Sequence, residues 1–223
     1  RTGDPVERRA AIDALARIAQ PSPAIGDLLL ATLTEPRDAL RAAAARGLDR
    51  TPVREAMVLP LVDALGDRLA PVRSAAARAL LRYAESHWPS TTPTTVFAAR
   101  TEALLARLTD ADADVRRIAL LLLAWAAPLG PDLAVPIVEC ARDADAGVRR
   151  QAVETLARVS DSAAARRELV ERLGDPNGAI RVAAFQALVR LGTIAPDDAR
   201  LLHRVRREPL DADARRRLVA LSA

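Results

Sequence analysis

The chain has 223 residues, of which 50% are hydrophobic and only 2% aromatic, and its formal net charge is +4. It is long enough to bury a sizeable core, and alanine, leucine and valine must supply the packing. Its one cysteine, Cys140, excludes an internal disulfide and fits a reducing compartment. Its apolar runs are far shorter than the roughly 18 residues needed to span a bilayer, and no signal peptide is visible. We therefore expect a soluble, cytoplasmic protein.

Helices are predicted along the whole chain. Alanine, leucine and arginine are strong helix formers, and no stretch alternates polar and apolar residues as a half-buried strand does. All 33 basic residues are arginine. In chain order, the amphipathic segments that we expect to form the first helix of successive helix pairs are 24–34, 53–65, 97–109, 132–141 and 163–173.

The second helices share a sequence repeat, in which an anchor residue is followed by Arg and then by a run of Ala and Leu residues. Successive anchors are 33, 32, 43, 33, 32 and 34 residues apart, so one step is about ten residues too long. In the first six copies, Ala stands four residues and Leu eight residues after the anchor, which places them in one helical stripe. The first and last copies depart from the pattern, since their anchors are not Val, Ile or Leu, as expected for the terminal units of a stacked array. The anchors are Glu7, Leu40, Val72, Val115, Val148, Ile180 and Ala214.

The joint inside each pair carries an acidic residue five positions before the anchor in most copies. Such residues are predicted to cap the following helix and to end the preceding one. We also expect these carboxylates to meet the Arg that follows each anchor, in a structural ladder that links the repeats. The ladder residues are Arg41, Arg73, Arg116, Arg149 and Arg181 with Asp67, Asp110, Asp143 and Asp175.

This pattern resembles HEAT repeats, in particular the short bacterial HEAT-like, PBS-lyase-type kind, over essentially the whole chain. The resemblance is strong at 110–116 and at 72–80. It implies an all-α fold, a right-handed α-α superhelix of about six to seven helix pairs, with the second helices on the concave side. Most members of the family bind or scaffold other macromolecules. A few are di-iron hydroxylases, chromophore lyases of light-harvesting proteins or alkylpurine DNA glycosylases.

Residues 1–223 are expected to form a single solenoid. The long step contains a Pro/Thr-rich stretch that cannot continue a helix, which predicts an inserted loop at about 86–96 between two three-repeat halves. Because the sequence begins with Arg1 rather than Met, a fragment of a longer chain is one interpretation. The inserted loop has two interpretations: Trp88 anchors a ligand, or the loop fills an irregular junction between the halves.

In the second helices, the residues expected to be exposed stand two, six and ten positions after each anchor. Because these positions are four residues apart, they lie on one face of the helix. In six copies these positions hold ten Arg and two acidic residues, 10 − 2 = +8, and in the fourth copy Leu121 and Trp125 interrupt them with an apolar spot. In the implied fold this face is concave and attracts an anionic partner, although a merely solvated arginine face fits the same pattern. The predicted partner-binding residues are Arg9, Arg17, Arg46, Arg50, Arg78, Arg82, Arg117, Trp125, Arg150, Arg158 and Arg190.

A second basic cluster lies near the C-terminus, among a few acidic residues. It is interpreted as a polar capping pair of helices or, alternatively, as a nucleic-acid contact. The cluster consists of Arg200, Arg204, Arg206, Arg207, Arg215, Arg216 and Arg217.

The sequence shows no pattern typical of a catalytic or metal site. His87 and His203 are far apart and neither is followed by Glu, which excludes the di-iron branch, and zinc spacing, a phosphate-binding Gly-rich loop and a nucleophile elbow are missing. We therefore predict no catalytic residue, metal or cofactor. The favoured function is a non-catalytic scaffold that binds an acidic protein segment. The alternatives are phosphate-mediated nucleic-acid binding on the same face, and an enzyme subunit of the chromophore-lyase or glycosylase kind with a pocket near Trp88 and Trp125.

Overall fold

The computed structural model describes residues 4–17, 22–48, 51–87, 97, 99–126, 129–159, 162–194 and 199–221. Within these ranges the secondary structure is helical, apart from turns and one isolated parallel bridge between Leu129 and Val159. None of the described helices has the length and apolar character needed to cross a membrane. The chain divides into two compact units, Arg1–Thr92 and Pro93–Ala223, which are described one at a time.

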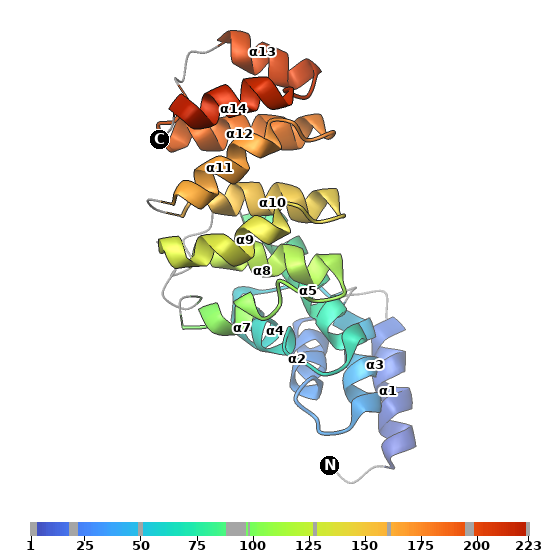
Figure 1. Cartoon of the computed structure of the whole chain (residues 1–223). Helices are drawn as coiled ribbons and strands as arrows, with labels where there is room; N and C mark the ends of the chain where they lie inside the picture. Colours follow the sequence, from blue (N-terminus) through green and yellow to red (C-terminus); the bar gives the residue numbers. More distant parts are fainter. Residues whose placement is uncertain are drawn as a thin grey trace. The chain divides into compact units, whose positions relative to one another are not determined.

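In the first unit the helices alternate between two layers (Figure 1). They are α1 (Pro5–Arg17), α2 (Pro23–Thr32), α3 (Asp38–Leu48), α4 (Val58–Ala64, after a 3₁₀ turn at Glu55–Met57) and α5 (Ala70–His87). Helices α1, α3 and α5 pack side by side, while α2 packs on α3 and α4 packs on α5. The predicted order of first and second helices is therefore confirmed in this unit.

Helix α5 extends further than the sequence predicted. Ser86 and His87 still belong to it, so the expected loop at 86–96 begins too early. A proline restricts the residue before it and excludes itself from a helix interior, and Pro89 therefore allows the helix to run almost up to it. The rest of the predicted loop, including Trp88, lies outside the described residues.

The second unit repeats the same alternation in its first three pairs. Its helices are α7 (Thr101–Leu105), α8 (Ala113–Trp125), α9 (Ala134–Cys140, after a 3₁₀ turn at Pro131–Leu133), α10 (Ala146–Leu156), α11 (Ala163–Arg172), α12 (Gly178–Arg190), α13 (Ala199–Arg207) and α14 (Ala212–Leu221). Helices α8, α10 and α12 pack in sequence as one layer, and α9 and α11 pack beside each other as the other (Figure 1). The predicted all-α solenoid class is confirmed.

The last two helices exchange places. Helix α13 packs on α12, in the layer of second helices, whereas α14 packs on α11, in the layer of first helices. The N–H of Leu210, in the turn between them, donates to the carbonyl of Leu173 at 3.0 Å. The copy anchored at Ala214 therefore does not continue the second-helix layer, which agrees with the prediction that the end copies depart from the regular repeat.

The core stripe predicted for the second helices is confirmed in copies two to six. The anchors, the alanines four residues later and the leucines eight residues later are all buried, and the alanines let neighbouring helices approach closely. In the fifth copy the buried Thr155 adds a hydrogen bond from its hydroxyl to the carbonyl of Leu120 at 3.1 Å, which ties α10 to α8. In the first copy Ala11 is exposed.

The joint aspartates do not cap the following helices as predicted. The described N-caps are the residues two positions later: Asp112, for example, accepts the N–H of Asp114 at 2.8 Å, at the start of α8. The predicted residues instead accept the N–H two residues ahead, which tightens the joint itself. This turn contact is made by Asp67, Asp110, Asp143 and Asp175.

Cys140 is expected to resist alkylation in the folded protein. Its thiol is buried in α9 beside the carbonyl of Leu108, and burial raises its pKa from 9.0 to about 11. Two pKa units lower the reactive thiolate fraction about 100-fold. We expect iodoacetamide at pH 8 to leave the native protein unmodified while it labels the urea-unfolded chain, as read by mass spectrometry. Equal labelling rates in the two states would contradict this.

Candidate functional site

Three of the arginines that follow the anchors, Arg41, Arg116 and Arg149, link consecutive joints. In each case the guanidinium Nε donates to a carboxylate in the next joint, while Nη1 donates to two backbone carbonyls of its own joint; Arg116 Nη1, for instance, reaches the carbonyls of Asp110 and Ala111 at 2.7 and 3.1 Å. Such bidentate, charge-assisted contacts are strong and directional. The pairs are Arg41 with Asp67 at 2.7 Å, Arg116 with Asp143 at 2.7 Å and Arg149 with Asp175 at 2.9 Å.

These contacts favour the charged form of both partners. Burial alone would raise the pKa of Asp143, but the hydrogen bonds from Arg116 and from the N–H of Asp145 outweigh it, and the pKa lies below its usual 3.8. The hydrogen bond to Asp143 in turn raises the pKa of Arg116. Because these guanidinium groups are engaged within the repeats, the ladder is structural and offers little to a ligand.

The other two predicted ladder arginines contact backbone carbonyls. Arg73 Nη1 donates to the carbonyls of Asp67 and Arg68, in its own joint. Arg181 is buried and, among the described residues, forms no ion pair; its Nε donates to the carbonyl of Val205 at 2.6 Å. Its Nη2 contacts the carbonyl of Arg206 at 3.4 Å, so that it holds the C-terminal end of α13. Arg181 therefore donates hydrogen bonds to the partly negative C-terminal end of α13, whereas Arg41, Arg116 and Arg149 donate to an aspartate.

The predicted partner-binding residues differ in exposure and engagement. Arg82 Nη2 donates to the carbonyl of Leu48 at 2.9 Å, and Arg117 forms an ion pair with Asp114 at 3.6 Å. The side chain of Arg17, in α1, and the residues Arg50 and Trp88 lie outside the described part of the structure. The exposed members are Arg9, Arg46, Arg150, Arg158 and Arg190, and the half-buried ones are Arg78, Arg82, Arg117 and Trp125.

The apolar spot predicted in the fourth copy is mostly covered. Leu121 is buried, and the half-buried Trp125 packs against the fully buried Phe97, with ring centroids 5.6 Å apart at 51°. Tilted aromatic pairs of this kind stabilise a core. The expectation that Leu121 is exposed is therefore wrong, and part of the Trp125 ring serves packing.

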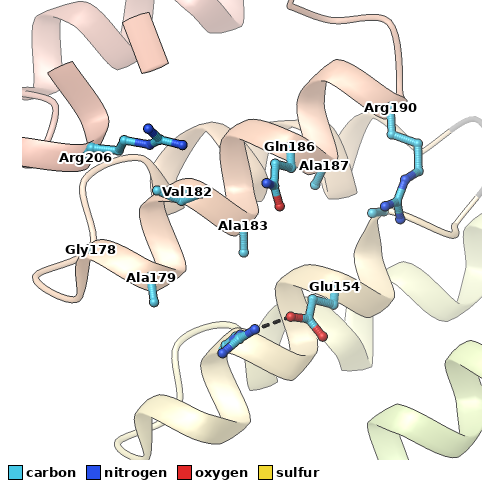
Figure 2. Close-up of a pocket in the computed structure, with 11 residues that line it drawn as sticks. Glu154, Gly178, Ala179, Val182, Ala183, Gln186, Ala187, Arg190 and Arg206 are labelled. Atoms are coloured by element: carbon cyan, nitrogen blue, oxygen red, sulfur yellow. Dashed lines mark hydrogen bonds and ion pairs between the residues drawn. The ribbon is translucent and has the colours of Figure 1, made fainter. Parts of the chain in front are cut away.

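A groove of about 460 Å³ lies between α10 and α12, with α13 at one end (Figure 2). Its floor is made of small residues such as Ala179, Val182 and Ala183, and its rim carries Arg and Gln side chains. Five of the lining residues occupy the stripe positions two, six or ten after an anchor. They are Arg150, Glu154, Val182, Gln186 and Arg190.

The arginines around the groove differ in their contacts. Arg150 Nε pairs with Glu154 on the same helix at 3.0 Å. In the described part of the chain, the side chains of Arg190 and Arg206 make no hydrogen bond or ion pair, and both are exposed. Three arginines and one glutamate thus surround a small apolar floor, which suits an anionic group that also has apolar atoms.

Arg206 is the lining residue that the sequence did not assign to this face. It was placed in the C-terminal cluster, and only the exchange of α13 and α14 brings it to α12. One sequence signal points to that exchange: position five before the last anchor is Pro209, so the final joint lacks the aspartate that Arg181 would reach in a regular repeat.

Comparison with known proteins supports the repeat assignment. Residues 134–222 match the family model of HEAT repeats. This confirms the resemblance read from the sequence, and the match to HEAT repeats spans α9 to α14.

The solved structures that are similar to this chain include designed repeat proteins. A computationally designed armadillo repeat protein for modular peptide recognition aligns with a TM-score of 0.61 and 18% identity, over 84% of this chain and 94% of that one. A designed armadillo repeat protein in complex with the peptide (KR)4 aligns with a TM-score of 0.59 and 17% identity, over 85% and 95%. At these identities the likeness shows the fold alone. No curated protein sequence matches the chain.

Metal-ligating side chains do not cluster in the described part of the chain, where no group of three or more His, Cys, Asp or Glu residues could hold a metal ion.

Proposed function

We propose that this repeat scaffold binds an acidic protein segment on the arginine-rich face of its second helices, without catalysis. The groove between α10 and α12 carries the proposal, because stripe residues and Arg206 gather there around an apolar floor. Complementary charge steers a partner to such a surface and fixes its position. Exposed guanidinium groups bind carboxylates bidentately, which gives the contact direction.

Two designed armadillo repeat proteins of similar fold are described as designed for peptide recognition or as bound to a peptide. One of them is in complex with the peptide (KR)4, which is basic, whereas the groove here carries three arginines and one glutamate. An acidic segment is the matching ligand for the opposite sign of charge. In our proposal the exposed Arg158, a stripe residue of the second unit outside the groove lining, extends the contact. Arg9 and Arg46 of the first unit remain proposed binding residues, and Trp88 remains the proposed loop anchor.

Nucleic acid is the second candidate ligand, since the exposed Arg158, Arg190 and Arg206 also suit phosphates. Binding of this kind would weaken steeply with salt.

Two further statements remain predictions from the sequence pattern. One is that the two units form one solenoid, and the other is that the protein acts in a bacterial cytoplasm.

The proposed function can be tested by fluorescence anisotropy with three pools of short labelled peptides of equal length. The pools mix Ala and Ser with Glu and Asp, with Gln and Asn, or with Lys and Arg, and a single-stranded and a duplex DNA are titrated beside them. We expect the acidic pool to bind at least about tenfold more tightly than the others, a difference of roughly 1.4 kcal/mol. Equal affinity for the acidic and amide pools, or tighter binding of DNA, would overturn the proposal.

A further inference from the structure

We propose that the groove between α10 and α12 selects an extended peptide segment with two acidic side chains four residues apart and a small apolar side chain midway between them. This inference rests on the proposed function and specifies which acidic segments the groove accepts. It follows from the positions of two unengaged arginines and one glutamate.

The two unengaged arginines mark opposite ends of α12. A Cβ built on Gly178, the first residue of that helix, would lie 3.7 Å from the carbonyl oxygen of Arg206, whereas Arg190 is the last residue. Figure 2 shows Arg206 extending over the Val182 end of the groove and Arg190 at the other end. With a rise of about 1.5 Å per residue, the helix is about 12 Å long from Val182 to Arg190 and about 18 Å long from Gly178.

The spacing of the arginines sets the spacing of the acids. An extended chain advances about 3.3 Å per residue, and its side chains alternate between two faces, so that residues an even number apart point the same way. Two acids four residues apart are about 13 Å apart, which lies within the helix lengths of about 12 to 18 Å estimated above. A separation of two residues gives about 7 Å and six residues give about 20 Å, which are too short and too long.

Glu154 determines which peptide side chain the groove accepts midway between the two acidic side chains. Its carboxylate is half-exposed below the middle of the groove and pairs with Arg150 at 3.0 Å (Figure 2). An acidic side chain at the midpoint would face this carboxylate and be repelled, whereas Ala179 and Ala183 offer a floor for a small apolar side chain. A nucleic-acid strand carries a phosphate at every nucleotide and cannot avoid the same repulsion, which favours a peptide.

The experiment uses labelled peptides with a Ser/Ala backbone and two glutamates separated by one to eight positions, titrated against the full chain by anisotropy. Affinity is expected to peak at a separation of four, at least about tenfold above separations of two and six. A third glutamate at the midpoint is expected to weaken binding to the wild type. If affinity followed only the number of glutamates, the spacing inference would be wrong while the proposed function would stand.

Matched variants separate the parts of this proposal. Arg206→Gln and Arg190→Gln are expected to abolish the preference for a separation of four, whereas Arg207→Gln, at an exposed neighbour outside the groove lining, leaves it unchanged. Glu154→Gln is expected to remove the penalty for the midpoint glutamate. Thermal unfolding of each variant verifies that the fold is intact. Identical behaviour of Arg206→Gln and Arg207→Gln, or a penalty that survives Glu154→Gln, would overturn the proposal.

Discussion

Replacing Arg181 by methionine is expected to lower the free energy of unfolding by about 3 kcal/mol and to loosen the last two helices. Arg181 is 4% exposed. Its guanidinium donates hydrogen bonds to carbonyls of two segments: those of Val205 and Arg206 at the end of α13, and those of Asp175 and Pro176 in its own joint. Hydrogen bonds to a charged group contribute about 1.5–3 kcal/mol each, and removal leaves buried carbonyls without a donor. Methionine keeps the apolar volume, so the loss comes mainly from the hydrogen bonds.

Urea unfolding monitored by circular dichroism gives the size of the effect, and hydrogen exchange shows where it acts. Amides of α13 are expected to lose protection first. Arg204→Met is the matched control, because Arg204 lies on α13, the helix that Arg181 contacts, and its ion pairs in the described part of the chain, with Glu208 and Asp211, are exposed. Such surface pairs are worth about 0–1 kcal/mol. If Arg181→Met and Arg204→Met lowered the free energy of unfolding equally, the buried guanidinium of Arg181 would not be what holds α13 in place.

The same substitution is expected to weaken binding of an acidic peptide, although Arg181 does not line the groove. It fixes the backbone of Arg206, whose side chain forms one end of the groove, and so acts as a positioning residue. Arg181→Lys, which keeps the charge but loses the bidentate geometry, should restore little of this function. Unchanged spacing preference in Arg181→Met would rule out the positioning role.

The replacement Asp175→Ala is expected to cost about 3–5 kcal/mol of unfolding free energy. Asp175 is 3% exposed, pairs with Arg149 Nε at 2.9 Å and accepts the N–H of Asn177 at 2.8 Å. Breaking a buried ion pair by removing one partner is more costly than removing both, because the other charge remains without compensation. Arg149→Met together with Asp175→Ala should therefore lose less than the sum of the single changes.

A double-mutant cycle measured by urea unfolding isolates this coupling. Glu208→Ala serves as the control, since Glu208 pairs with Arg204 at an exposed site and its loss should change the free energy by less than about 1 kcal/mol. A coupling energy between Arg149 and Asp175 of zero would show that this contact does not link the repeats energetically.

Most of the helical framework could be predicted from the sequence, because it depends on local order. Helical period, small alanines at the contact points and an arginine beside each anchor recur at a nearly constant step, and each copy packs mainly on its neighbours. The positions of the first and second helices follow from this, as do the buried stripe and the location of the stripe residues around the groove. The details of the joints did not follow, because an aspartate can close its own turn as readily as cap the next helix.

The sequence by itself determined the repeat, the burial of its alanines and leucines and the arginine-rich face of the second helices, since these depend on spacing within one helix or between adjacent repeats. Only the tertiary structure decided the exchange of α13 and α14, the packing of Trp125 on Phe97 and the arrival of Arg206 at the groove. These features lie at places where the repeat is interrupted. There the periodic pattern carries no information, and side-chain hydrogen bonds such as those of Arg181 select the packing.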